Sequence, residues 1–225
     1  MIYPQTGPKI GVIGGGQLAR MMASAAHELG LDLHILAEKE DASAVPVVPH
    51  APVGDYTDLT TVREFARDKA VVTFDHEHVP GEILQALIAD GINVQPRPEA
   101  LIYAQDKLEM RKAVQRLGLP NPQWAEVTTV EELLAFGDQT GWPVVLKTPR
   151  GGYDGKGVLM LNSADDARGG TVQRWFAELP ERNDFSSLLA EEKVPFTREL
   201  SALVARRDSG EVKAWPVAES CLLYT

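Results

Sequence analysis

A lysine at the end of an apolar run is followed by a glycine-dense loop, a pairing that suits phosphate chemistry. Lys147 closes the run VVLK, and PRGGYDGKG begins two residues later at Pro149. Glycines let such a loop turn its N–H groups toward phosphates, and Lys147 and Lys156 would add positive charge against a triphosphate. The loop is not a Walker A motif, because the gap from Gly151 to Gly155 is one residue short and Gly157 replaces the hydroxyl residue. A flexible surface turn with solvated lysines is the competing interpretation.

A second glycine-rich turn, GGGQLA, follows the apolar run KIGVI near the start of the chain. Gly14, Gly16 and Ala19 fit the dinucleotide-binding pattern loosely, and Glu38 lies about 20 residues further on, where a ribose-binding acid would stand. The N-terminus of the following helix could equally hold another phosphate ligand. A tight turn without a ligand is the third interpretation.

Two polar groups complete the candidates. The run LLAEEKV at 188–194 ends in acids that could present backbone groups to an adenine edge, and Glu199 could accept hydrogen bonds from ribose hydroxyls. A solvated acidic strand end explains the same residues without a ligand. His76 and His78 in TFDHEHVP would share one face of a strand, but two ligands do not make a metal site, so no metal-binding residue is expected. Polar residues at the end of a parallel strand more often mark a substrate cleft.

The elements that must position these residues alternate between strand and helix over the first ninety residues. We expect strands at 9–13, 33–37, 70–74 and 92–94, and helices at 17–29, 60–67 and 81–90. This alternation predicts βαβ units around a parallel sheet. The first helix should bury one face, formed by Leu18, Met21, Met22, Ala25, Ala26 and Leu29.

The punctuation QPRP at 95–98 marks a candidate domain boundary. Asp106 and Glu109 predict the start of a helix that runs to Leu117, with Met110, Val114 and Leu117 in the core. An α+β block should follow, with strands at 124–127, 144–148 and 158–161 and a helix at 130–139. The segments 188–192, 200–206 and 213–217 read as three strands of a third sheet.

Composition limits the function classes. The 225 residues are 44% hydrophobic and 24% charged, as in soluble globular proteins. A net charge of −10 disfavours nucleic acid and anionic lipid as partners. There is a single cysteine, the first residues do not resemble a signal peptide, and no run of ~18 apolar residues could span a bilayer. We therefore expect a cytoplasmic protein that binds neither membranes nor nucleic acid.

Taken in order, the motifs resemble those of the ATP-grasp superfamily, and within it the 5-(carboxyamino)imidazole ribonucleotide synthases. The resemblance rests on GVIGGGQLARM, VVTFDHEHVP, AQDKLEMRKAVQRLGLPNP, WPVVLKTPRGGYDGKGV and LAEEKVPFTRELS. It implies an α/β fold with three parts: a Rossmann-like pre-ATP-grasp domain at 1–98, an α+β lid at 99–187, and the beginning of a catalytic subdomain at 188–225. It also implies an ATP-dependent carbon–nitrogen ligase of purine biosynthesis. This enzyme uses bicarbonate, through carboxyphosphate, to carboxylate aminoimidazole ribonucleotide.

The resemblance also implies roles for individual residues. Lys107 and Lys147 would contact ATP phosphates, Glu199 would bind the ribose, and Gln17, Leu18, Glu77 and His78 would hold the imidazole ribonucleotide. The closing loop over ATP would comprise Gly152, Tyr153, Asp154, Gly155, Lys156, Gly157 and Val158. The adenine hinge would comprise Glu191, Glu192, Lys193 and Val194. Tyr153, Asp154 and Lys156, together with Lys147, are the expected catalytic residues.

The family's C-terminal part, which supplies the Mg²⁺-binding carboxylates and the surface through which the family tends to dimerise, is not found in this sequence. We therefore expect a chain that keeps the substrate domain and the lid but does not turn over alone. Two alternatives stay open. One is a nicotinamide-dependent oxidoreductase that uses Gly14, Gly16 and Glu38; the other is a non-catalytic nucleotide-binding remnant.

Overall fold

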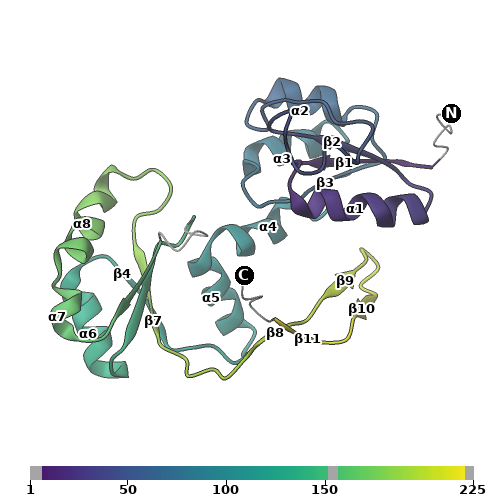
Figure 1. Cartoon of the computed structure of the whole chain (residues 1–225). Coiled ribbons are helices and arrows are strands. Elements are labelled where there is room, and N and C mark those ends of the chain that lie inside the picture. Colours follow the sequence, from purple (N-terminus) through teal and green to yellow (C-terminus); the bar gives the residue numbers. More distant parts are fainter. Residues whose placement is uncertain (1–6, 152–156, 221–225) are drawn as a thin grey trace.

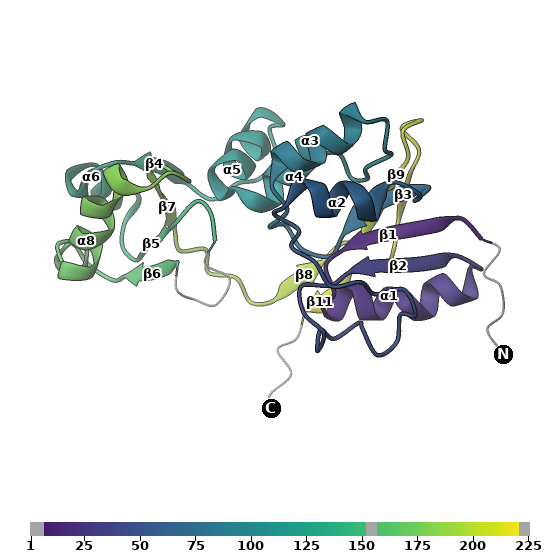
Figure 2. The same ribbon diagram turned by 90° about the horizontal axis from the view of Figure 1, so that it is seen from above.

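The computed structural model describes residues 7–151 and 157–220. Its first unit is a three-stranded parallel sheet with the order β2-β1-β3. The strands are β1 (Lys9–Ile13), β2 (Asp32–Leu36) and β3 (Val71–Phe74). The helices are α1 (Gln17–Glu28), α2 (Leu59–Ala66) and α3 (Gly81–Ala89). Figure 2 shows α1 on one face of the sheet and α2 and α3 on the other. The predicted βαβ pattern is confirmed, although the expected strand at 92–94 is reduced to one bridge between Val72 and Val94.

Alternate residues of each strand supply two separate cores, as the strand period of two requires. Val12 packs with Ile35 and α1 on one face, whereas Ile13 packs with Leu36 and the helices of the other face. A parallel sheet covered on both faces in this way buries its strands, which explains the apolar run at 10–13.

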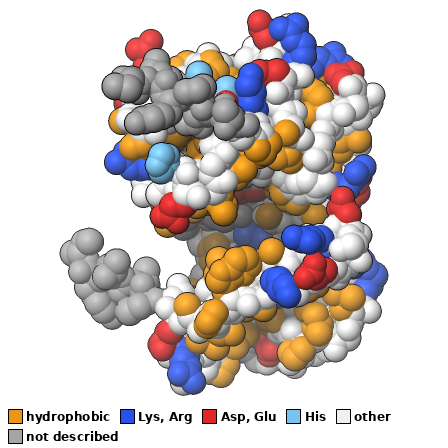
Figure 3. Space-filling view, turned by 90° about the vertical axis from the view of Figure 1, so that its right-hand side faces the viewer, with side chains coloured by type: hydrophobic (Ala, Val, Ile, Leu, Met, Phe, Trp, Pro, Cys, Tyr) orange, Lys and Arg blue, Asp and Glu red, His pale blue; other side chains and the backbone are white. Residues whose placement is uncertain are grey.

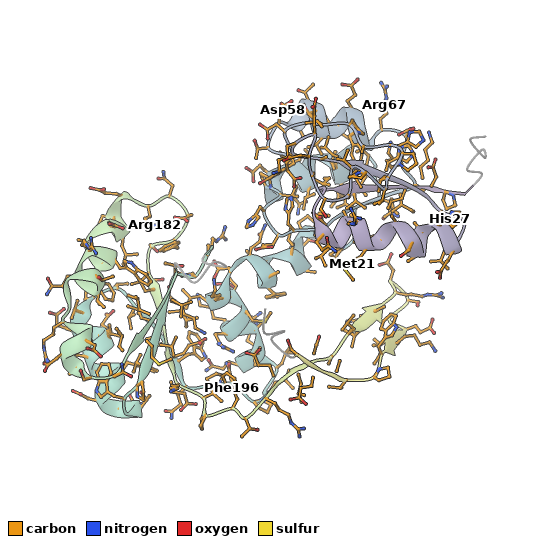
Figure 4. The ribbon with its side chains drawn as sticks, viewed as in Figure 1. Met21, His27, Asp58, Arg67, Arg182 and Phe196 are labelled. Atoms are coloured by element: carbon orange, nitrogen blue, oxygen red, sulfur yellow. The ribbon has the colours of Figure 1, made fainter. Side chains whose placement is uncertain are left out.

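The buried face of α1 differs from the predicted one. Ala19 and Ala26 are buried, whereas Met21 is 62% exposed and Leu18 and Leu29 are also exposed. Figure 4 shows Met21 on the side of α1 that faces away from the sheet. Small side chains let the helix lie close to the sheet. The predicted face is therefore right for Ala26 and partly right for Met22, which packs against this core, but wrong for the exposed Leu18, Met21 and Leu29.

Two consecutive helices connect the first unit to the second, and Figure 1 shows them between the two. They are α4 (Pro98–Gln105), which the sequence analysis missed, and α5 (Lys107–Arg116). Asp106 caps α5 as predicted, because its carboxylate accepts hydrogen bonds from the first-turn amides. The expected core stripe on α5 is only partly right, since Leu117 is 72% exposed and Met110 is also exposed.

The second unit, called the lid unit below, is an antiparallel sheet with the order β4-β7-β5-β6. Its strands are β4 (Trp124–Val127), β5 (Val144–Lys147), β6 (Val158–Leu161) and β7 (Leu188–Glu192). Its helices are α6 (Val130–Thr140), α7 (Ala164–Ala167) and α8 (Gly170–Glu178), followed by a 3₁₀ turn at Leu179–Glu181. These helices and the sheet share one core of residues such as Leu133, Leu146 and Leu188. The sequence analysis missed α7 and α8.

The expected third sheet is not formed as predicted. β7 pairs with β4 and β5 in the lid unit. Residues 193–220, called the arm below, form two short ladders with exposed side chains. These ladders pair β8 (Glu199–Ser201) with β11 (Ala218–Ser220), and β9 (Val204–Arg206) with β10 (Val212–Ala214). The arm exposes several large apolar residues, including Phe196, which is labelled in Figure 4. No helix among the described residues is long and apolar enough to cross a membrane.

Candidate active site

Lys147 and Glu191 meet on the face of the lid sheet opposite its core. Along β5, Val144 and Leu146 are buried, so Lys147 points to the other face. Lys147 pairs with Leu189 in the β5–β7 register, and Glu191 stands two residues further along β7 on the same face. The Lys147 ammonium donates to one oxygen of the Glu191 carboxylate. A strand period of two and an antiparallel register therefore bring together two groups that are 44 residues apart.

Arg111 of α5 is the second partner of Glu191, and its Nε donates to the other carboxylate oxygen. The Glu191 side chain is only 5% exposed. Burial raises the pKa of Glu191, but the hydrogen bonds from Arg111 and Lys147 outweigh burial and leave that pKa below its ordinary value. Glu191 is therefore a buried, ionised carboxylate between two cations.

Lys107 brings a third cation to the same place. Its Nζ donates to the carbonyl oxygens of Gly151 at 2.7 Å, Thr148 at 3.3 Å and Pro149 at 3.4 Å. Burial lowers the pKa of Lys107, and the charge of Lys147 lowers it further. An anion placed beside Lys107 would offset both effects and stabilise its charged form.

These side chains line a cavity of about 140 Å³. Its lining residues are Tyr103, Lys107, Met110, Arg111, Lys147 and Glu191. Three cations against one carboxylate leave the cavity positive in a protein whose net charge is −10. Figure 3 shows the surface hollowed between two lobes, with basic side chains visible inside the hollow. The arrangement suits a polyphosphate. Arg111 and Tyr103 were not predicted as site residues, and Met110 was expected in the core. Arg111 could have been found, because it lies four residues after Lys107 and so shares its helix face.

A second cavity, of about 250 Å³, lies next to the segment that Lys107 holds. Glu77 and His78, both predicted to bind substrate, line it together with Gln105, Arg150 and Gly151. Gln105 donates to the Glu77 carbonyl at 2.8 Å. Gly151 lines this cavity and accepts a hydrogen bond from Lys107, which lines the smaller one, so a single contact links the two linings.

Gln17 and Leu18 do not line either of these cavities among the described residues. Gln17 begins α1 and accepts a hydrogen bond from the Ser43 hydroxyl at 3.0 Å, and Leu18 is exposed. Their role in substrate binding stays a prediction.

The amides of the first glycine turn are already occupied by carboxylates of this chain. Asp75 accepts from the Gly16 amide at 2.7 Å and lies 3.4 Å from the Ala19 amide, while Glu38 accepts from the Gly15 amide at 3.1 Å. Gly14 has φ +115°, and a Cβ there would lie 1.7 Å from an Asp75 oxygen. The turn is therefore shaped around an internal carboxylate, which competes with a dinucleotide phosphate for the Gly16 and Ala19 amides and disfavours the oxidoreductase alternative.

Two groups of described residues place possible cation ligands within 4.8 Å of one another. Glu38 and Asp75 join His76 in the first group, which does not include His78. Asp32, His34 and His50 form the second. The two rings of the second group stack at 4.3 Å with an interplanar angle of 13°, so their nitrogen lone pairs do not converge on one point.

The predicted hinge residues are bonded partly within the protein. The Glu192 carboxylate accepts from the Gln123 amide at 2.9 Å, and the Lys193 amide donates to Pro143 at 3.3 Å. Val194 and Glu199 are exposed at the start of the arm.

Of the predicted closing loop, Gly157 accepts from the Thr148 amide at 3.0 Å and Val158 begins β6. Gly152, Tyr153, Asp154, Gly155 and Lys156 lie outside the described residues.

Comparison with known proteins identifies the family. Residues 8–105 match the ribonucleotide synthetase preATP-grasp domain, and residues 112–221 match the ATP-grasp domain. The chain belongs to the ATP-grasp superfamily. The resemblance seen in the sequence is thereby confirmed, as is the mixed α/β fold class.

Within this superfamily, the chain is similar to curated proteins of one kind, the N5-carboxyaminoimidazole ribonucleotide synthases. The chain is 48% identical to the N5-carboxyaminoimidazole ribonucleotide synthase of Corynebacterium ammoniagenes over 213 residues, which are 95% of this chain and 50% of that protein. Identity to the synthase of the same name from Mycobacterium tuberculosis H37Rv is 44%, over 95% of this chain and 48% of the relative. The chain thus spans about half the length of the curated relatives it matches.

Solved structures of synthases of this kind also superpose on the chain. An ADP complex of an N5-carboxyaminoimidazole ribonucleotide synthetase superposes with a TM-score of 0.83 at 34% identity, covering 99% of this chain and 56% of that one. The synthase from Aspergillus clavatus in complex with ADP and 5-aminoimidazole ribonucleotide superposes with a TM-score of 0.78 at 26% identity, covering 97% and 55%.

Proposed function

We propose that this chain forms the nucleotide-binding and acceptor-binding half of an N5-carboxyaminoimidazole ribonucleotide synthase. In this reaction the γ-phosphoryl group of ATP passes to a bicarbonate oxygen and gives carboxyphosphate and ADP. Carboxyphosphate then loses phosphate to release carbon dioxide, and the exocyclic amine of aminoimidazole ribonucleotide forms the new N–C bond and gives up a proton. The observation that carries the proposal is the convergence of Lys107, Arg111 and Lys147 on one cavity, in a chain 44–48% identical to such synthases.

Phosphoryl transfer needs positioned cations more than covalent help from the protein. Lys107 and Lys147 are the two ammonium groups that can meet phosphate oxygens in the smaller cavity. The neighbouring cavity, lined by Glu77 and His78, is the place we assign to the ribonucleotide. A lid that closes over ATP would keep water from a labile acyl phosphate. We assign the predicted loop residues Tyr153, Asp154 and Lys156 to that closure.

Mg²⁺ accompanies ATP in reactions of this class and would neutralise charge on the phosphates. Among the described residues that line the smaller cavity, Glu191 is the one carboxylate, and both of its oxygens are paired with cations. The described cavity does not supply carboxylates that fit the metal, so we derive no step through it. A cytoplasmic location and a homodimeric assembly are likewise predictions.

Nucleotide titration tests the assignment. Fluorescence or calorimetric titration of the chain with ATP and with NADH should show saturable binding of ATP alone. Lys147→Met should weaken ATP binding about a hundredfold, because a buried charge–phosphate contact contributes roughly 2–3 kcal/mol. Lys213→Met, an exposed change on β10, is the matched control and should bind ATP as the parent does. Saturable NADH binding, or unchanged ATP affinity in Lys147→Met, would reject the proposal.

A further inference from the structure

The two cations on Glu191 are held very differently. Arg111 is fixed at both ends, because its Nε donates to Glu191 and its Nη1 donates to the Asn121 side-chain oxygen at 3.1 Å. The Asn121 amide in turn donates to the Arg111 carbonyl at 3.1 Å. Arg111 therefore belongs to a closed hydrogen-bonded unit that joins α5, the turn after it, and β7.

Lys147 has no such second anchor. Among the described hydrogen bonds and ion pairs of its ammonium, Glu191 is the only partner. Its ammonium group ends a flexible four-carbon chain and has three N–H donors, so it can turn toward a new acceptor. Lys147 is the cation of this pair that can move, whereas Arg111 stays where the turn and the helix hold it.

This difference matters because Glu191 is buried. A buried carboxylate that loses its only counterion is strongly destabilised, so a lysine paired alone with Glu191 could not leave it without a large penalty. With Arg111 in place, the carboxylate keeps a charged, hydrogen-bonded partner when Lys147 turns away. Lys107 is not involved in this exchange, because backbone carbonyls hold its ammonium.

We propose that Arg111 is a positioning residue of the nucleotide site. It acts as the permanent counterion of Glu191 and thereby lets Lys147 exchange that carboxylate for a phosphate oxygen of the bound nucleotide. The inference rests on the function proposed above, in which Lys147 meets ATP. Arg111 itself does not need to touch the nucleotide.

The test is a double-mutant cycle read by ATP affinity. Arg111→Met removes the charge and should weaken ATP binding about tenfold, since Lys147 must then stay on Glu191. Arg111→Lys, which restores one cation, should recover most of the affinity. Arg116→Met, an exposed change on the same helix, is the matched control and should bind ATP as the parent does.

The decisive comparison uses Glu191→Gln, which removes the carboxylate that needs a counterion. In that background Arg111→Met should change ATP affinity less than twofold. An equal tenfold loss in both backgrounds would overturn the inference, because Arg111 would then act independently of Glu191. Full ATP affinity in folded Arg111→Met would overturn it as well.

Folding is checked by circular dichroism for every variant. If Arg111→Met does not fold, the double variant and Glu191→Gln still decide, because neither leaves Glu191 as an unpaired buried charge. Equal affinities of these two support the inference, and weaker binding by the double variant rejects it. Absence of ATP binding by the parent chain would instead reject the proposed function and this inference with it.

Discussion

Replacing Gly14 by alanine tests whether the first glycine turn is built around Asp75. The residue has φ +115°, a region that side chains rarely adopt, at a cost of about 1–3 kcal/mol. The new Cβ would also lie 1.7 Å from one Asp75 oxygen. Moving the carboxylate would break its 2.7 Å bond to the Gly16 amide, which contributes roughly 1.5–3 kcal/mol as a charge-assisted bond.

Together these effects predict a loss of about 3–5 kcal/mol in the unfolding free energy of the first unit, a large share of the ~5–15 kcal/mol typical of a domain. Denaturant unfolding followed by far-UV circular dichroism measures this loss. Tryptophan fluorescence provides an internal reference, because Trp124, Trp142, Trp175 and Trp215 all lie outside the first unit. The Gly14→Ala change should therefore shift the dichroism transition more than the fluorescence transition.

Gly91→Ala is the matched control. Gly91 also has a positive φ, +84°, but a Cβ there would meet nothing within 4 Å, so only the backbone cost of about 1 kcal/mol applies. If Gly14→Ala costs no more than Gly91→Ala, the Asp75 contact is not what demands glycine. The penalty should also shrink when Asp75 is already alanine, because the clash and the hydrogen bond are then both absent.

Three further changes test other parts of the molecule. Gly137→Ala should destabilise the lid unit in thermal unfolding, although alanine favours helices, because its Cβ would lie 2.2 Å from the Trp142 ring; a raised melting temperature would refute this. Asp106→Ala should cost about 1–2 kcal/mol in denaturant unfolding, since it removes the α5 cap and the 3.0 Å ion pair with Arg150; unchanged stability would show that water replaces both. The pKa of Glu191 is lowered in the folded state, so the ionised carboxylate stabilises the fold above the ordinary carboxyl pKa, and this stabilisation is lost as the pH falls through the folded-state pKa. Glu191→Gln should therefore flatten the acid side of a plot of stability against pH. An unchanged acid side would contradict the ion-pair assignment.

Local patterns in the sequence were sufficient for much of the fold. Strand and helix periodicity predicted the first unit, and the Asp106 cap predicted the start of α5. The α4 helix was missed because the proline-rich segment at 95–98 was interpreted only as a domain boundary. Pro98 in fact occupies the first turn of this helix.

Long-range pairing was what the sequence could not show. β7 was expected in a third sheet, but it pairs with β4 and β5. Local composition could not show this, because the choice of neighbouring strands depends on contacts between distant parts of the chain. The partnership of Arg111 with Glu191 spans 80 residues, and that of Asp75 with Gly16 spans 59. Helical spacing likewise did not separate the exposed Leu18, Met21 and Leu29 of α1 from the side that packs on the sheet. That side includes Ala26, which was predicted, and Ala19, which was not.

The carboxylate of Asp75 has a consequence for anyone who would redesign the first unit. In many α/β domains the amides of this turn are open to a coenzyme phosphate. Here the Asp75 carboxylate accepts from the Gly16 amide and occupies that position. Side chains introduced around the turn to recognise a coenzyme would therefore have to compete with the Asp75 carboxylate. Removing Asp75 to make room would loosen the turn that has to hold the coenzyme.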